Sequence, residues 1–187
     1  EQRDDKAPEG EAHAFEFPPL RRAARHSHSP PPALVYDTFV KRGDHDFERD
    51  VALPVLIETA RLWRGLGHHD SSGRFRIDGV TGPDEYSAIA DNNVYTNLLA
   101  QQNLRGAADV TIRHPDAAAA LGADAEEAAS WRDAAEDMFV PYDEHLGIHP
   151  QSEGFTEHAV WDFDATEPDD YPLLLHAPYF ELYRKQV

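Results

Sequence analysis

Two adjacent carboxylates, Asp84 and Glu85, directly follow a Gly82-Pro83 pair in this sequence. A carboxylic acid can protonate a leaving oxygen if it is held in place and if its pKa is raised toward neutrality. The Gly-Pro turn supplies the first condition, and the neighbouring carboxylate helps with the second, because two close carboxylates resist ionising together. The same composition is also common in plain turns and at helix starts, where acidic residues suit the helix dipole. These residues alone leave both interpretations open.

A row of amides and hydroxyls follows the turn, comprising Asn92, Asn93, Thr96 and Asn97. The last three of these share one side of a helix, because they are spaced three and four residues apart. Such groups could bind the hydroxyls of a sugar, or they could hydrogen-bond a buried loop. Spacing alone does not decide between the two uses.

The pattern upstream of the turn predicts a helix and a short strand. Apolar residues recur on one face of the expected helix at Phe47, Val51, Val55 and Leu62. Pro54 lies inside this run and marks either a kink or the first turn of the helix. The segment GRFRIDGV, at 73–80, then predicts a short strand that runs into the turn.

The pattern from the turn onward is also mainly helical, with a further helix expected upstream at about 33–40. We expect a long helix over about 92–106, and a second one opened by Asp124 with acidic residues in its first turn. Residues 140–172 carry Gly, Pro and aromatic residues without a helical period, which predicts an ordered excursion. A last helix begins near Pro178. The sequence therefore predicts a mostly α protein with short strands and ordered loops between the helices.

Composition excludes several classes of partner. The chain has 187 residues, enough for one domain or part of a larger one, with 17 Lys and Arg against 35 Asp and Glu. A net charge of -18 repels nucleic acid and anionic membrane surfaces, so we expect neither as a partner. No apolar run is long enough to span a membrane and no signal-peptide pattern is visible, so we expect a cytoplasmic protein.

Metal-ligating patterns are weak in this sequence. There is no Cys, which excludes thiolate sites and a Cys nucleophile. The histidines of HSH at 26–28 and of the pair at 68–69 are not spaced four apart beside carboxylates, as a helical metal site would need. We therefore expect no metal and no organic cofactor.

Several long motifs, in order along the chain, resemble segments of glycoside hydrolase family 65, the maltose, trehalose and kojibiose phosphorylases. The signature is GVTGPDEYSAIADNNVYTNLLAQ at 79–101, preceded by DFERDVALPVLIETARLW at 46–63. Two later segments agree, GIHPQSEGFTEHAVWDF at 147–163 and YPLLLHAPYFELYRKQV at 171–187. The resemblance covers roughly residues 33–187. A Trp followed by an acidic residue, which the family carries upstream, has no counterpart in residues 1–32.

The resemblance implies a fold and a reaction. It implies that residues 33–187 form part of an (α/α)6-barrel catalytic domain, preceded by an irregular Pro-, His- and charge-rich segment at 1–32. The Glu of the GPDEY motif is the family's general acid, which corresponds to Glu85. Inorganic phosphate would act as co-substrate and attack the anomeric carbon of an α-glucosyl disaccharide, so that a β-sugar 1-phosphate forms with inversion.

Further site residues are expected around the general acid. We interpret the amide-rich helix as part of the wall of a glucoside site, with Asp84, Asn93 and Asn97 as candidate sugar-binding residues. A Lys-Gln pair that binds the donor glucose in the family corresponds to Lys185 and Gln186, and a solvated helix end is the competing interpretation. The chain ends in YFELYRKQV, within an expected helix, so we expect a piece of a longer protein that is inactive alone.

Two alternatives to the phosphorylase remain open. A trehalase-like hydrolase on the same scaffold would need a second carboxylate about 6.5–9.5 Å from the first, to activate water. The other alternative is a non-catalytic remnant that binds sugar weakly or only contacts a partner. For the complete enzyme, a homodimer is a candidate assembly.

Overall fold

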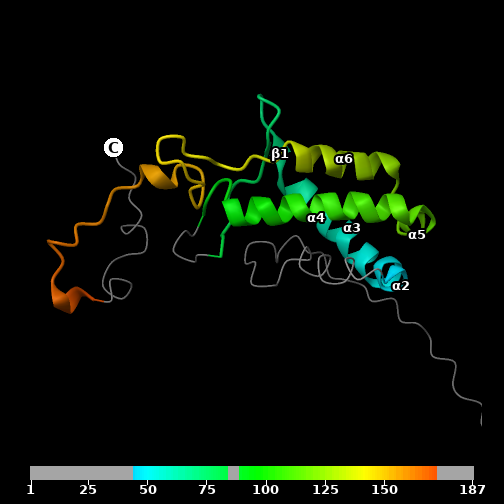
Figure 1. The fold of residues 1–187 in the computed structure, drawn as a ribbon, viewed down its shortest axis with the longest axis horizontal. Helices are drawn as coiled ribbons and strands as arrows, with labels where there is room; N and C mark the ends of the chain where they lie inside the picture. Colours follow the sequence, from blue (N-terminus) through cyan, green and yellow to red (C-terminus); the bar gives the residue numbers. More distant parts are fainter. Residues whose placement is uncertain (1–43, 84–88, 172–187) are drawn as a thin grey trace, which may run out of the picture.

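The computed structural model describes residues 44–83 and 89–171. Within these residues the chain is mostly helical, with one short hairpin and long connections, which confirms the expected class (Figure 1). The helices expected at 33–40 and from Pro178 lie outside the described residues, as does the segment 1–32. No described helix is long and apolar enough to cross a membrane.

The first helical rod is formed by α2 (His45–Phe47), the π-helical η3 (Glu48–Ala52) and α3 (Leu53–Leu66). Pro54 lies in the first turn of α3, one of the two placements expected for it. The apolar face read from the sequence is only partly buried, since Val51 and Val55 are 45% and 37% exposed. The buried positions of α3 are Leu53, Leu56, Ile57 and Ala60. The π-helical stretch explains this difference, because its wider turn breaks the i, i+4 register that the prediction assumed.

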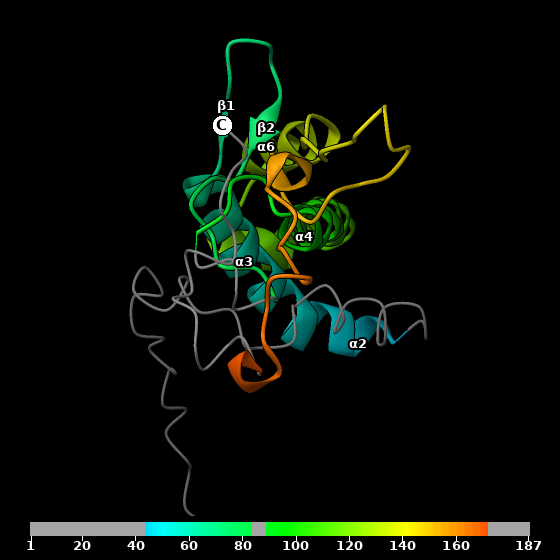
Figure 2. The same cartoon turned by 90° about the vertical axis from the view of Figure 1, so that its left-hand side faces the viewer.

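The long helix α4 (Val94–Arg113) packs against α3 on one side and against α6 (Ala125–Glu136) on the other, and the short α5 (Pro115–Ala120) follows it (Figures 1 and 2). The predicted end of α4 near residue 106 is wrong. A glycine inside a helix costs only about 1 kcal/mol relative to alanine. Gly106 and several residues after it are buried against the neighbouring helices, so packing carries α4 on to Arg113. The start of α6 is confirmed, since the Asp124 carboxylate accepts a hydrogen bond from Glu127 N (2.8 Å).

The core lies where these three helices meet, and alanines dominate it. α4 contributes Ala100, Leu104, Ala107, Ala108 and Val110, and α6 contributes Ala128, Trp131, Ala134 and Ala135. Small side chains let helix backbones approach closely, while the fully buried Trp131 fills the remaining volume. Packing in this core fixes the position of α4. The polar residues of the candidate site lie at the N-terminus of this helix.

A two-stranded hairpin links α3 to the 78–92 segment. β1 (His68–His69) pairs antiparallel with β2 (Phe75–Arg76), in the register His68 with Arg76 and His69 with Phe75. The strand expected within 73–80 corresponds to β2, whose partner β1 the sequence did not reveal. β2 is also held on its other side, because Phe75 N donates to Asp137 O (2.7 Å) and Phe139 N donates to Phe75 O (2.8 Å). The hairpin is thereby tied to the end of α6.

The region expected to be an ordered excursion contains two single-turn helices, η4 (Phe155–Glu157) and η5 (Pro168–Asp170). Its first part returns to the N-terminus of α4, where Val94 N donates to Gln151 O (3.0 Å) and Glu153 N donates to Asp91 O (3.1 Å). Residues far apart in sequence are therefore brought to the start of α4.

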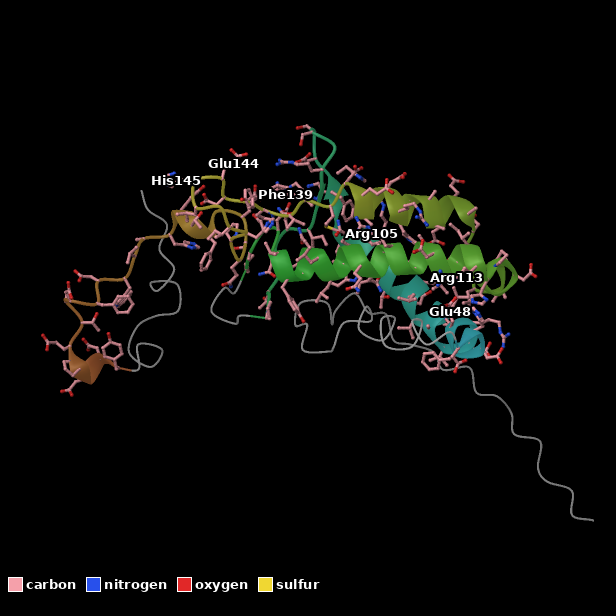
Figure 3. All side chains as sticks on the ribbon, viewed as in Figure 1. Glu48, Arg105, Arg113, Phe139, Glu144 and His145 are labelled. Atoms are coloured by element: carbon pink, nitrogen blue, oxygen red, sulfur yellow. The ribbon has the colours of Figure 1, made fainter. Side chains whose placement is uncertain are left out.

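A buried carboxylate ties the first rod to the far end of α4. Glu48 is 3% exposed and accepts hydrogen bonds from Arg113 Nε (2.8 Å) and Nη2 (3.1 Å), and His114 Nε2 lies 2.9 Å from its Oε1 (Figure 3). Burial alone raises the pKa of the Glu48 carboxyl, but the hydrogen bonds and charges of Arg113 and His114 outweigh it and lower the pKa. The ionised form is thus the one that stabilises the fold.

We predict that Glu48→Gln lowers the free energy of unfolding at neutral pH by about 2 kcal/mol, the size of a hydrogen-bonded charged pair. Since folding lowers the Glu48 pKa, its contribution is present above the unfolded value of about 4.3 and is lost as pH falls through the folded pKa. Urea titrations at pH 7 and at about pH 3 should therefore show the difference between wild type and variant shrinking in acid. Glu144→Gln, at an exposed glutamate, is the control and should change little at either pH (Figure 3). An equal difference at both pH values would contradict this role.

Candidate active site

The predicted acid turn belongs to a loop that is closed at its base by backbone hydrogen bonds. Val80 N donates to Ala90 O (3.0 Å) and Ala90 N donates to Val80 O (2.8 Å), an antiparallel bridge that closes residues 81–89 into a loop. Asn92 N donates to Ile77 O (2.9 Å) one step further from the loop. Glu85 is equally far along the chain from both residues of the bridge.

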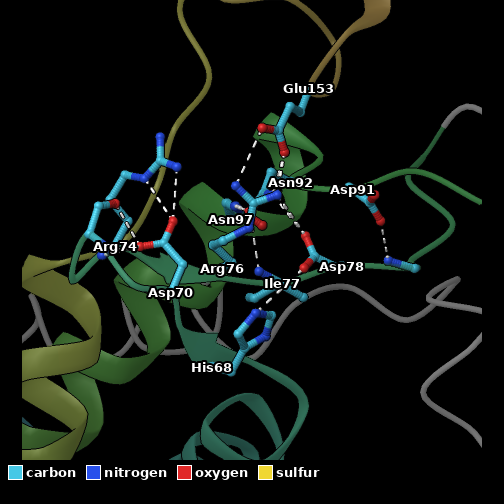
Figure 4. Close-up of polar contacts among 12 residues, drawn as sticks. His68, Asp70, Arg74, Arg76, Ile77, Asp78, Asp91, Asn92, Asn97 and Glu153 are labelled. Atoms are coloured by element: carbon cyan, nitrogen blue, oxygen red, sulfur yellow. Dashed lines mark hydrogen bonds and ion pairs between the residues drawn. The ribbon is translucent and has the colours of Figure 1, made fainter.

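Asn92 lies at the base of the 81–89 loop, and its carboxamide is fully hydrogen-bonded (Figure 4). Its Oδ1 accepts from Ile77 N (3.2 Å) and Asn97 Nδ2 (3.2 Å). Its Nδ2 donates to Asp78 Oδ1 (2.8 Å) and Glu153 Oε2 (2.9 Å). Asn92 is completely buried and its backbone has φ 50°, in the left-handed region that Asn tolerates better than most residues. The side-chain bonds hold this unusual conformation, which turns the chain into α4.

Arg76 connects the carboxylates on either side of Asn92. Its guanidinium donates to both oxygens of Glu153 and, from Nη2, to Asp78 Oδ1 (3.3 Å). The hydrogen bond from Arg76 lowers the pKa of the Glu153 carboxyl, and the same bond raises the pKa of Arg76. Arg76, Asp78, Asn92 and Glu153 are called the polar brace below. The brace joins β2, the start of α4 and the 151–154 segment.

Asn93 lies directly beneath the start of the 81–89 loop. Its Oδ1 caps α4 by accepting from Thr96 N (3.1 Å), while its Nδ2 is buried without a hydrogen-bond partner among the described residues. A Cβ at Gly82 would come within 2.4 Å of this Nδ2. Gly82 is therefore needed here for close approach, which explains the Gly of the Gly-Pro pair.

Asn97 is also buried within the protein. Its Nδ2 donates to Asn92 Oδ1 and to Phe139 O (2.7 Å), and its Oδ1 has no partner among the described residues. Asn97 thus hydrogen-bonds a connecting segment, which was one of its two possible uses, whereas Asn93 caps the helix. Sugar binding by these two residues stays a prediction.

Asp84, Glu85, Lys185 and Gln186 lie outside the described residues, and their roles stay predictions as well.

Sequence reasoning did not assign the polar brace. Asn92 was noted only as one of a polar row, and Glu153 only as part of a matching motif. The available signal was an Arg and an Asp flanking an apolar residue in RFRID, which is unusual beside a buried strand. Their partner is remote in sequence, so no local pattern could reveal the pairing.

One group of described side chains could in principle hold a metal ion, namely His45, Glu48 and His114, whose ligand atoms lie within 4.8 Å of one another. The Glu48 carboxylate already accepts from Arg113, and the guanidinium would repel an incoming dication. We therefore assign this group to the ion pair of the fold. The His68 and His69 side chains each face a carboxylate of their own, on Asp78 and Asp137.

Comparison with known proteins identifies the family. The model of the glycosyl hydrolase family 65 central catalytic domain matches residues 18–187. A glycosyl hydrolase of Mycobacterium tuberculosis, itself uncharacterised, is 54% identical over 156 residues, covering 83% of this chain and 20% of the relative. The α,α-trehalose phosphorylase of Geobacillus stearothermophilus is 49% identical over 152 residues, covering 77% of this chain and 20% of the enzyme. The chain thus spans about a fifth of the length of these relatives.

A solved structure shows the same fold. A protein from the human microbiome, named provisionally as a kojibiose phosphorylase, superposes with a TM-score of 0.70 at 22% identity, over 82% of this chain and 24% of that one. This likeness confirms the expected helical architecture, part of an (α/α)6 barrel. The family match begins at residue 18, within the segment interpreted as irregular, and the domain boundary at residue 33 stays a prediction. The chain belongs to glycosyl hydrolase family 65 and carries part of its central catalytic domain.

Proposed function

We propose that the protein carrying this chain is an inverting disaccharide phosphorylase that cleaves an α-glucoside with inorganic phosphate. The observation that carries the proposal is that the two ends of the segment containing Glu85 are paired at Val80 and Ala90, next to the buried residues that start α4. The phosphorylase names among the relatives support the same reaction class. A general acid on a segment whose two ends are fixed is suited to a defined approach to its substrate.

In this mechanism Glu85 donates its proton to the glycosidic oxygen as the bond to the anomeric carbon breaks. A phosphate oxygen attacks that carbon from the opposite face, so the product is β-glucose 1-phosphate and the leaving group departs as a neutral alcohol. The proton carried by the attacking hydrogen phosphate is released from the product to solvent, and a proton from solvent restores the Glu85 carboxyl group, so the reaction consumes no net proton. A single catalytic carboxylate is sufficient, because phosphate is itself the nucleophile.

Three described carboxylates beside the loop are poor candidates for the base that a hydrolase would need. A hydrolase needs a second carboxylate to act as a base toward water. Glu153 is bound by Arg76 and Asn92, which lowers its pKa and weakens it as a base. Asp91 accepts a hydrogen bond from Gly79 N (2.9 Å), and Asp78 accepts from Asn92 and Arg76. All three carboxylates accept hydrogen bonds from residues at the base of the loop.

We take α,α-trehalose as the first disaccharide to test, since the trehalose phosphorylase of Geobacillus stearothermophilus is 49% identical to this chain. Its phosphorolysis would give β-glucose 1-phosphate and glucose. A cytoplasmic location belongs to the same proposal, because a sugar phosphate is charged and is retained only by the compartment in which it forms. A homodimer is the assembly that we propose for the complete protein.

We predict that Glu85→Gln in the complete protein lowers turnover of trehalose about 10²–10⁴-fold, the usual contribution of general acid catalysis. The substitution removes the transferable proton and keeps the side-chain shape, so circular dichroism should be unchanged. Glu126→Gln, at an exposed glutamate of α6, is the matched control and should keep the wild-type rate. A Glu85→Gln variant with a near-normal rate would overturn the assignment of the acid.

We also expect breakdown of trehalose to require inorganic phosphate and to yield β-glucose 1-phosphate as the initial product, visible by phosphorus NMR. Free glucose as the only product, at a rate indifferent to phosphate, would favour the hydrolase. A folded complete protein that binds sugar but turns over neither with phosphate nor with water would favour the non-catalytic remnant.

A further inference from the structure

We propose that Glu153 and Arg76 are positioning residues, whose ion pair acts through Asn92 to hold the base of the 81–89 loop in the geometry from which the Glu85 carboxyl reaches the glycosidic oxygen. This inference rests on the function proposed above. It assigns a role in the reaction to two side chains that lie outside the loop itself (Figure 4).

The first argument is that the loop base does not need this ion pair in order to close. The backbone bonds between Val80 and Ala90 and between Ile77 and Asn92 already form the base. The 151–153 segment is likewise held by two backbone bonds of its own, to Asp91 and Val94. The Glu153 side chain therefore adds a constraint to segments that are already in place.

The second argument concerns cost. Arg76 is only 15% exposed in its side chain, and withdrawing a guanidinium from water is unfavourable unless its partners compensate. The pair spans 77 residues of sequence, so closing that contact also has an entropic cost. Because desolvation offsets much of the attraction, net stability alone is weak grounds for such a contact, and we assign to it the selection of one geometry.

The third argument concerns what the ion pair constrains. Glu153 Oε2 accepts from both Arg76 and Asn92, so the ion pair orients the Asn92 carboxamide. Asn92 in turn has the left-handed backbone that sets the direction in which the chain leaves the loop. Losing the Glu153 charge would loosen this carboxamide and, with it, the anchor at residues 90–92 from which the segment carrying Glu85 starts. Displacement of a catalytic group by about 1 Å can cost about 10²-fold in rate.

The test compares two substrates that differ in how much they need the acid. Glucose is a poor leaving group and must be protonated, whereas fluoride leaves as an anion without a proton. We therefore measure kcat on trehalose and on α-glucosyl fluoride, both with inorganic phosphate, in the complete protein. Glu153→Gln should lower kcat on trehalose about 10–100-fold, by displacing the acid, and should lower kcat on α-glucosyl fluoride less than about threefold. KM should change little, and the thermal midpoint should fall only modestly, because the Glu153 side chain is 39% exposed and a carboxamide there can still accept hydrogen bonds. Arg76→Lys should show the same split between substrates more weakly, since it keeps the charge and loses the bidentate geometry.

The control is Glu127→Gln. Glu127 accepts from Arg61 Nε (2.7 Å) and Nη2 (2.9 Å), a paired Glu–Arg contact between α6 and α3 away from the loop. The same chemical change there should leave kcat on both substrates unaltered. A second comparison is the double variant of Glu85 and Glu153, both to Gln. Because Glu153 acts only through the acid, the double variant should be no slower on trehalose than Glu85→Gln alone.

Three results would overturn the inference. Equal losses on both substrates would show a merely structural role, whatever the thermal midpoint. A further loss in the double variant would show that Glu153 acts independently of Glu85, and a normal rate for Glu153→Gln would show no role. If Glu85→Gln shows no preferential loss on trehalose, the proposed function fails and this inference fails with it. If Glu85→Gln behaves as expected and Glu153→Gln does not, only the inference fails.

Discussion

The carboxamide of Asn92 is the contact on which the candidate site depends. With four hydrogen bonds it joins the end of the hairpin, the first turns of α4 and the remote segment around Glu153. Two of these three pieces are anchored elsewhere as well, the hairpin on the end of α6 and α4 in the core between α3 and α6. The buried Asn92 side chain therefore connects the base of the 81–89 loop to elements that are packed in the helical core. An unsatisfied group at this position would be costly, which makes the arrangement specific.

Charge is used in a similar way at both ends of α4. At its N-terminus Arg76 and Glu153 are paired across the start of the helix, and at its C-terminus Glu48 is paired with Arg113. Each ion pair joins residues that are far apart in sequence. The first fixes the segment around Glu153 against the start of α4, and the second fixes the segment around Glu48 against its end. The excess of acidic residues in the chain makes these few partly buried cations important, because each neutralises a carboxylate that would otherwise oppose folding.

Local patterns predicted what local physics determines. The cap of α6 at Asp124, the strand at 75–76 and the mostly helical class follow from capping chemistry and periodicity, and the resemblance supplied the family and its barrel. The prediction failed where tertiary packing overrides local preference. Gly106 did not end α4, and the π-helical turn moved the buried face of α3 away from Val51 and Val55. The polar brace was beyond reach because Glu153 pairs with residues more than sixty positions away.

The central claim is that the 81–89 loop, held at its base by Asn92, presents Glu85 to the bond that is cleaved. The most direct measurement is a crystal structure of the complete protein as the Glu85→Gln variant, with trehalose and phosphate bound. The account predicts the residue 85 amide within about 2.6–3.2 Å of the glycosidic oxygen, phosphate on the opposite face of the glucosyl ring, and Glu153 bonded to Asn92 and Arg76 beneath the loop. A structure in which residue 85 faces away from the sugar, with a different carboxylate beside the glycosidic oxygen, would contradict it.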